Sequence, residues 1–318
     1  MNPTMTRRAL VGAGAVAVTR AAGAKSVKPA EPRFYVAALT ALDTRGSLDD
    51  ALAKDYLAYL AANGVDGVLV LGTTGEFSAF SVKERRQIVD SYARHRGRLA
   101  FMVQVGALNL GDTLELLAQA TAAGAELALV APPFYFKNLS TEGLARFFLP
   151  VLEAARIPVL LYNIPQLTGV PITADVLRRL ASSPNLYGIK DSYSKEAAML
   201  ETMREFPKLH VLTGVPGNIA ANLKAGGAGA ITGNGSAFPR ETSAIFSAFR
   251  KGGDVAAAQA PLNERARVIG GYNGIAAQKF LVTRVGLREM HCRPPLVDLT
   301  AEEKRALTAK LREIQVNN

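Results

Sequence analysis

The chain has 318 residues, of which 49% are hydrophobic and 20% are charged, and its formal net charge is +10. This balance is typical of a globular protein and excludes a disordered or collagen-like chain. The single cysteine, Cys292, excludes an internal disulfide, and the three histidines have no ligand-type neighbours at metal-binding spacing. We therefore expect no metal site.

The first thirty residues carry a large part of the positive charge. Residues 1–30 hold five of the basic side chains and no acidic one, so half of the net charge lies there. The rest of the chain has no basic run interleaved with aromatic side chains, and we expect no nucleic-acid partner.

The same thirty residues resemble an export signal. Arg7 and Arg8 precede an apolar stretch at residues 9–18 and then Ala22-Gly23-Ala24, an order typical of a twin-arginine signal with a small-residue cleavage site. A disordered tail and an organelle presequence are the alternatives. The apolar stretch is too short to span a bilayer, and we expect no membrane segment.

From residue 33 onward, short apolar runs alternate with longer amphipathic stretches. Eight runs predict strands that are buried on both faces, as in a parallel sheet covered by helices. Several follow a glycine that ends the preceding helix, as Gly64, Gly124 and Gly226 do. The predicted strands cover residues 35–39, 67–71, 100–105, 127–130, 159–162, 187–190, 211–213 and 228–232.

Amphipathic helices are predicted between the strands and after them. Eight strand–helix units, with no glycine-rich dinucleotide turn after the first strand, favour a (β/α)8 TIM barrel with additional C-terminal helices over an open doubly wound sheet. We see no linker and expect one domain over residues 31–318. The predicted helices cover residues 48–62, 82–96, 110–123, 142–155, 174–181 and 195–206, followed by 255–269, 275–285 and 300–314.

Polar residues follow three of the apolar strands, at the barrel end where the loops form the open mouth. They are Gly72-Thr73-Thr74-Gly75-Glu76, Tyr162-Asn163-Ile164-Pro165 and Gly188-Ile189-Lys190-Asp191-Ser192. Lys190 closes an apolar run, and burial there favours a neutral amine, which can form an imine with a ketone. A surface lysine or an ion pair with Asp191 is the alternative.

The other two motifs carry groups that suit such an imine. Tyr162 lies at the equivalent depth one strand earlier, where a phenol can exchange protons with a carbinolamine; a core tyrosine with a satisfied hydroxyl is the alternative. Thr73 and Thr74, flanked by glycines, present hydroxyls and backbone N–H groups to a carboxylate. We interpret Glu76 as an acid that favours the dipole of a following helix.

Together the motifs resemble the dihydrodipicolinate synthase and N-acetylneuraminate lyase superfamily of Schiff-base class I aldolases and lyases, over residues 33 to about 311. The interval of 28 residues from Tyr162 to Lys190 is similar to the family's. Thr168-Gly169 and Arg293-Pro294-Pro295-Leu296 also match family segments.

The resemblance implies a lyase that acts on a pyruvate-type 2-oxo acid and needs no cofactor. It implies that Lys190 forms the Schiff base and that Tyr162 is the acid/base. It also implies that Thr73 and Thr74 hold the substrate carboxylate, with Thr73 linking Tyr162 to solvent.

Further positions are implied by the same resemblance. Gly214 and Ile231 fall where the family lines the pocket, and Tyr135 is the candidate for a relay tyrosine lent to a neighbouring subunit. A homo-oligomer, a tetramer built from dimers, follows from that exchange. The family expectation is a cytoplasmic protein, with the periplasm as the alternative if the export signal operates.

Two departures from the sequence patterns of the family restrict the range of substrates that we expect. Leu167 stands where synthases that use aspartate semialdehyde carry an arginine, and leucine cannot bind a carboxylate bidentately. Val215-Pro216-Gly217 replaces the acidic residues of sialic-acid lyases. We expect a smaller or less hydroxylated 2-oxo acid, of the 4-hydroxy-2-oxoglutarate or 2-keto-3-deoxy sugar acid type. The alternatives are 4-hydroxy-tetrahydrodipicolinate synthase itself, a 2-keto-3-deoxy acid dehydratase and a non-catalytic 2-oxo acid binding protein.

Overall fold

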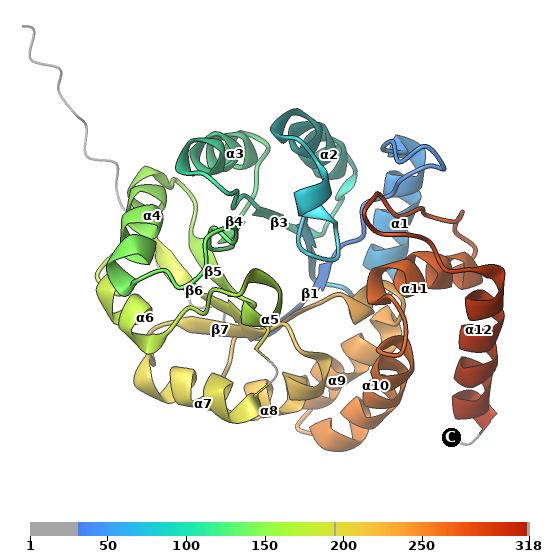
Figure 1. The fold of residues 1–318 in the computed structure, drawn as a ribbon. Helices are drawn as coiled ribbons and strands as arrows, with labels where there is room; N and C mark the ends of the chain where they lie inside the picture. Colours follow the sequence, from blue (N-terminus) through green and yellow to red (C-terminus); the bar gives the residue numbers. More distant parts are fainter. Residues whose placement is uncertain (1–30, 194, 317–318) are drawn as a thin grey trace, which may run out of the picture.

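Eight parallel strands form a closed barrel in chain order, with β8 pairing back onto β1 (Figure 1). The computed structural model describes residues 31–193 and 195–316, so the proposed export signal lies outside the described residues. The predicted TIM barrel is confirmed. The strands are β1 (Arg33–Ala37), β2 (Gly67–Val70), β3 (Ala100–Gln104), β4 (Leu127–Val130), β5 (Val159–Asn163), β6 (Leu186–Asp191), β7 (His210–Thr213) and β8 (Gly229–Thr232).

Helices follow the strands around the barrel, and the last three helices of the described chain pack beside it. They are α1 (Asp50–Ala62), α2 (Val82–His95), α3 (Leu110–Ala122), α4 (Thr141–Ala154), α5 (Pro165–Thr168), α6 (Ala174–Leu180), α7 (Glu196–Glu205), α8 (Ile219–Lys224), α9 (Pro239–Arg250), α10 (Val255–Ile269), α11 (Gly274–Leu281) and α12 (Ala301–Val316). Short 3-10 helices are η1 (Phe77–Ala79), η2 (Pro216–Asn218), η3 (Asn234–Ser236) and η4 (Val282–Val285).

The differences from the predicted elements have local causes. Helices α5 and α8 have only four and six residues, too short to show a helical period in the sequence. Helix α9 was also missed, although Pro239 stands at its first turn, where proline is favourable. Strand β1 begins earlier than predicted because Arg33 and Phe34 pair with β8.

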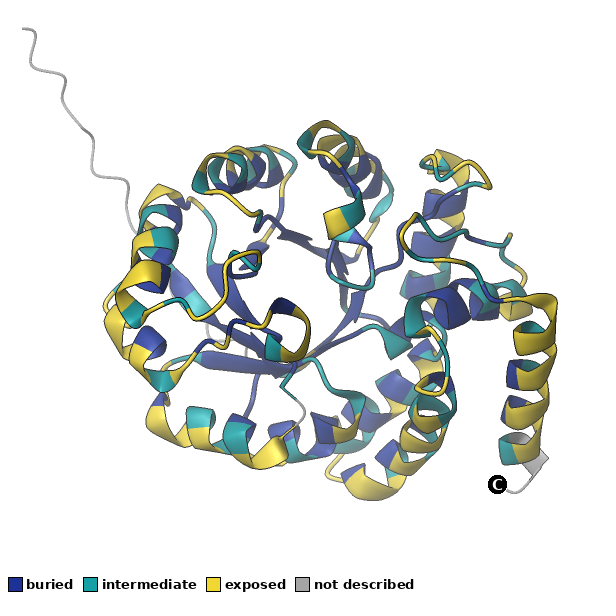
Figure 2. Ribbon diagram, in the orientation of Figure 1, coloured by how far each residue is buried: buried dark blue, intermediate teal, exposed yellow. Residues whose placement is uncertain are grey.

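Apolar side chains pack on both faces of the barrel wall, and the strands of the wall are coloured as buried in Figure 2. Successive side chains of a strand point to opposite faces, so one set fills the barrel and the other meets the helices. The outer layer is the larger. The inner layer includes Tyr35, Leu69, Met102, Leu129, Leu160, Tyr162, Leu212 and Ile231.

The last three helices form a separate apolar cluster beside the barrel. Leu281 of α11, Leu299, and Leu307 and Leu311 of α12 belong to it. Helix α12 packs against α10 and α11, which connects the end of the described chain to the barrel (Figure 1). Over residues 31–193 and 195–316, no helix is both long and apolar enough to cross a membrane.

Candidate active site

Lys190 and Tyr162 come together on neighbouring strands at the barrel mouth. Tyr162 of β5 pairs in register with Lys190 of β6, which pairs with Leu212 of β7, so all three side chains take the inner face. The Lys190 Nζ lies 4.2 Å from the centroid of the Tyr162 ring, and each residue is only 3% exposed. Within the described residues, the Lys190 amine has no hydrogen-bond or ion-pair partner.

Asp191 is not the partner of Lys190, which rules out the predicted alternative of an ion pair between them. Its carboxylate faces the opposite side of β6, where it accepts hydrogen bonds from Asn163 Nδ2 at 3.3 Å and from the backbone N–H of Tyr193 at 2.8 Å. Burial raises the pKa of Asp191 from its ordinary value, and these two hydrogen bonds oppose the shift. Lys190 is therefore a buried amine without a counter-ion in the part of the chain that the structure describes.

Thr73 meets the Tyr162 phenol. The Thr73 Oγ1 and the Tyr162 hydroxyl lie 3.2 Å apart, and either can donate. Thr74 lies beside the end of β8: a Cβ at Gly233 would come within 2.7 Å of the Thr74 Oγ1. Glycine at 233 therefore leaves room for the second threonine, and the predicted threonine pair is placed between β5 and β8.

The loop that carries both threonines has an unusual backbone. Leu71 and Glu76, at its two ends, take left-handed conformations with φ of 58° and 56°, which non-glycine residues seldom adopt. Such conformations persist only where the surroundings hold them. One restraint is the Thr40 hydroxyl, which donates to the Gly75 carbonyl at 2.7 Å.

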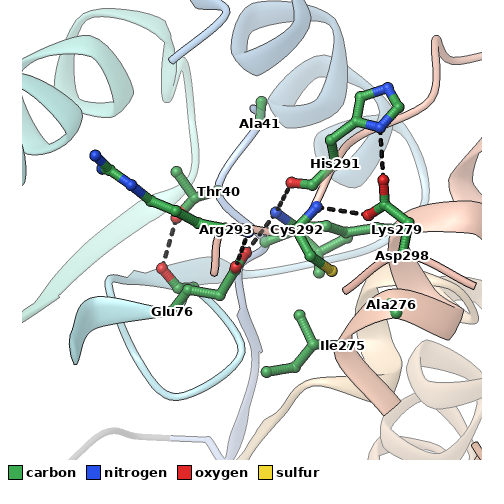
Figure 3. A network of polar contacts seen from close by, with 12 residues as sticks. Thr40, Ala41, Glu76, Ile275, Ala276, Lys279, His291, Cys292, Arg293 and Asp298 are labelled. Carbon is green, nitrogen blue, oxygen red and sulfur yellow. Dashed lines mark hydrogen bonds and ion pairs between the residues drawn. The ribbon is translucent and has the colours of Figure 1, made fainter. Parts of the chain in front are cut away.

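A buried ion pair supplies a second restraint on this loop (Figure 3). Glu76 pairs with Lys279 of α11, with both side chains 1% exposed, and it accepts a hydrogen bond from the Arg293 backbone N–H at 2.8 Å. Lys279 Nζ also donates to the His291 carbonyl at 2.5 Å. Glu76 makes no cap hydrogen bond with η1; its carboxylate contacts Lys279 and the Arg293 backbone N–H instead.

The C-terminal segment is held on this network by its own contacts. Asp298 accepts from the Cys292 backbone N–H at 2.7 Å and contacts His291 Nδ1 at 2.7 Å. Arg293 Nη2 donates to Glu84 at 2.6 Å, at the start of α2. Burial raises the pKa of Cys292 to about 12, so its thiol stays protonated at neutral pH. The chain end thus supports the threonine loop from outside the barrel.

Ile231 belongs to the inner layer of the barrel and Gly214 follows β7, but neither residue lines the cavity beside Thr73 and Tyr162, so their predicted pocket role stays a prediction. A Cβ at Gly214 would come within 3.2 Å of Lys190 Cε and 1.9 Å of Ser192 Oγ, so a side chain there would crowd the amine. Ile231 is fully buried on β8 and belongs to the same inner layer as Tyr162. Both positions border the chemistry without supplying a reactive group.

Tyr135 is not brought to the site of its own chain. Its side chain is 74% exposed, in the loop after β4, and its ring meets Phe136 edge-on at 5.3 Å between centroids. The neighbouring Phe134 points inward instead and packs edge-on against Phe77. A role for Tyr135 in proton transfer would therefore require a second subunit.

A cavity of about 220 Å³ opens beside Thr73 and Tyr162. A larger one, of about 520 Å³, lies between α1 and the C-terminal helices and contains none of the strand-end residues, so we assign the site to the smaller. No group of three or more His, Cys, Asp or Glu side chains among the described residues could hold a metal ion. The smaller cavity is lined by Thr73, Phe77, Ser78, Ala131, Phe134, Tyr162, Ile164, Leu167 and Thr168.

Comparison with known protein families identifies the family of this chain. A sequence profile described as the dihydrodipicolinate synthetase family matches residues 31–314. The chain belongs to this family. The predicted resemblance and the lyase class are confirmed, because family relatives and structural neighbours are lyases and aldolases.

Individual relatives of this dihydrodipicolinate synthetase family member cover almost its whole length. An uncharacterized DapA-like lyase of Chloroflexus aurantiacus is 39% identical over 90% of this chain and 98% of its own. A 4-hydroxy-tetrahydrodipicolinate synthase of Neisseria meningitidis is 33% identical over 87% and 96%. The structure of YagE from E. coli K12, a family protein in complex with pyruvate, superposes with a TM-score of 0.85 at 27% identity, covering 89% of this chain and 98% of that one.

Proposed function

We propose that this family member forms a Schiff base between Lys190 and a 2-oxo acid, and that it cleaves or forms the carbon–carbon bond next to the pyruvoyl unit. The observation that carries the proposal is the buried, unpaired amine over the Tyr162 ring. An amine with no hydrogen-bond acceptor or counter-ion among the described residues is free to attack the carbonyl carbon of a ketone. The resulting iminium accepts the electron pair of the breaking bond.

Tyr162 is proposed as the group that moves protons in this sequence. It gives a proton to the hydroxide that leaves the carbinolamine, and the phenolate then accepts the proton of the substrate's 4-hydroxyl as the C3–C4 bond breaks. The electron pair moves into the iminium and produces an enamine, which is protonated at C3 and hydrolysed to pyruvate. Thr73, in contact with the phenol, is positioned to relay these protons.

Thr73 and Thr74 are also proposed to hold the substrate carboxylate. Their loop ends in a buried, restrained network, so its hydroxyl and N–H groups are ordered before substrate binds. Such preorganisation reduces the cost of orienting the substrate. Glycine at position 214 allows the Ser192 and Lys190 side chains to approach the backbone after β7 closely.

A homo-oligomer is part of the proposal. Tyr135 is exposed on its own chain, and a neighbouring subunit that received it would gain a second phenol for proton transfer. The predicted tetramer built from dimers would provide this exchange. Sedimentation of wild type and Tyr135→Phe, with activity measured on the same samples, separates a loss of assembly from a loss of proton transfer.

Borohydride trapping tests the Schiff base directly. The protein is incubated with pyruvate and sodium borohydride, and intact mass and peptide mapping should show one reduced pyruvoyl adduct on Lys190. Lys190→Ala should give none. Lys195→Ala is the matched control, because Lys195 is also near a tyrosine ring, that of Tyr193 at 5.6 Å, but is exposed. An adduct that persists in Lys190→Ala, or no adduct in wild type, would overturn the proposal.

A further inference from the structure

We propose that the site takes 2-oxo acids whose distal group, beyond C4, is apolar or aromatic. The inference rests on the proposed function, since it concerns the half of the substrate that leaves as an aldehyde. It differs from the sugar-acid and dicarboxylate substrates that the sequence suggested. The cavity that opens from Tyr162 and Thr73 carries the argument.

The walls of this cavity are apolar. Phe77, Ala131, Phe134, Ile164 and Leu167 line it beyond the catalytic pair, and the two rings meet edge-on at 6.0 Å between centroids. A third flat ring can pack on such a pair in the same edge or offset manner. The aldehyde half of the substrate would lie between these side chains.

The cavity is lined by few polar side chains, and one of them is already hydrogen-bonded to the backbone. The Thr168 hydroxyl lies 3.1 Å from the carbonyls of Ile164 and Val170 and accepts from the Val170 N–H at 3.2 Å, so the backbone satisfies it. Besides Thr168, three lining residues carry a hydroxyl: Thr73, Ser78 and Tyr162. A polyhydroxylated chain would leave most of its hydroxyls without partners here, which is unfavourable on desolvation.

Charged groups near the cavity are directed elsewhere. None of its lining residues is charged. Lys137, beside it, donates to the carbonyls of Thr168, at 2.6 Å, and Phe134, and so ties the two loops together. Arg85, 5.5 Å from the Phe77 ring centroid, donates to the carbonyls of Gly106 and Gln104. A distal carboxylate would therefore enter an apolar space without a cation to receive it.

The size of the cavity suits a ring. Its volume is about 220 Å³. An apolar cavity of about 150 Å³ is enough to hold benzene. Leu167, which is 62% exposed at the rim, would cover one face of the bound group and lose its own contact with water.

A panel of three aldols tests the inference: 4-hydroxy-4-phenyl-2-oxobutanoate, 4-hydroxy-2-oxoglutarate and 2-keto-3-deoxygluconate. Cleavage breaks C3–C4 in each and releases pyruvate with benzaldehyde, glyoxylate or glyceraldehyde. We expect kcat/KM for the phenyl compound to exceed both others by about 10-fold or more, equivalent to about 1.4 kcal/mol. Equal or faster cleavage of either polar compound, with Lys190 still trapped by borohydride, would overturn the substrate class and leave the Schiff-base proposal intact.

Variants of the rim residue identify the source of the preference. Leu167→Ala should lower kcat/KM for the phenyl compound about 5- to 10-fold, chiefly through KM, because it removes uniform binding. Leu167→Arg should lower kcat/KM for the phenyl compound further and raise kcat/KM for 4-hydroxy-2-oxoglutarate. Leu108→Ala is the control, an exposed leucine outside the cavity lining. Unchanged selectivity in both Leu167 variants contradicts the inference, whereas absence of any Lys190 adduct overturns the proposed function and this inference together.

Discussion

The molecule buries two lysines in different ways. Lys279 is fully buried but pairs with Glu76 and donates to the His291 carbonyl. Lys190 is almost as buried, yet its amine lies over the face of the Tyr162 ring, with no acceptor within the described residues. Burial of an unpaired amine is unfavourable for stability.

The two lysines therefore differ in role: Lys279 stabilises the structure, whereas Lys190 is proposed to act in the chemistry. The Lys279 ion pair compensates for the loss of water around two charges and holds the Glu76 end of the threonine loop in place. Lys190 lacks this compensation and stays available to a ligand. An amine that is buried, has no partner among the described residues and lies over a ring that lines a cavity is a stronger indication of chemistry than burial alone.

Replacement of Lys190 should give the largest effect. Lys190→Met keeps the length of the side chain and removes the nucleophile, so pyruvate release should fall by about 10⁴-fold or more. The melting temperature should stay equal or rise, because no partner is lost. Steady-state assay and differential scanning calorimetry measure the two changes. A fall in melting temperature as large as that of Lys279→Met would contradict the contrast between the lysines.

Replacement of Lys279 should act chiefly on stability. Lys279→Met leaves the Glu76 carboxylate buried without its cation, which should lower the free energy of unfolding by about 3–5 kcal/mol. Urea denaturation measures this change in the free energy of unfolding. Adding Glu76→Gln should recover part of the loss, because the uncompensated charge is then gone. If the loss of unfolding free energy in the double variant equals the sum of the losses in the two single variants, the two residues do not act as a pair.

Two buried tyrosines offer a parallel contrast. Tyr162→Phe should reduce kcat by about 10²- to 10³-fold, because the phenol that moves protons is lost. Tyr56→Phe removes a phenol hydrogen-bonded to Ser236 at 2.7 Å, outside the site, and should cost about 1 kcal/mol of stability with activity retained. Activity assays and urea denaturation of both variants provide the comparison. Equal kcat values for them would exclude the proton role of Tyr162.

The half-buried ion pair between Glu84 and Arg293 should show a smaller, pH-dependent effect. Hydrogen bonds from the Ser81 backbone N–H, the Arg293 guanidinium and the Ser81 hydroxyl lower the pKa of Glu84 to about 2. A lowered pKa in the folded state means that this stabilisation is present above the unfolded pKa, about 4.5, and is lost as pH falls towards 2.

Glu84→Gln should therefore lower the melting temperature at pH 7 by a few degrees, with the difference from wild type shrinking below about pH 4.5. Thermal unfolding followed by circular dichroism at a series of pH values measures this difference. Glu115→Gln, which loses an exposed pair with Arg86, is the control and should change little. A difference that stays constant down to pH 2 would show that the Glu84 carboxylate charge is not what stabilises this segment.

Much of this protein could be predicted from its sequence by itself. Short apolar runs separated by helical stretches predict the eight strands, because burial on both faces leaves a local pattern. Lys190, Tyr162 and Thr73 could be found because the carboxyl ends of parallel strands meet at one mouth, so three polar strand ends imply one site. These inferences use only neighbouring residues and a general rule of barrel geometry.

The tertiary structure alone decided the rest. No local pattern shows that Lys279, on a late helix, reaches Glu76, or that Lys190 has no partner while Asp191 has two. The apolar walls around Leu167 likewise come from three separate loops. Pairing and cavity lining depend on residues distant in the chain, and their free energies depend on burial, which exists only once the barrel has closed.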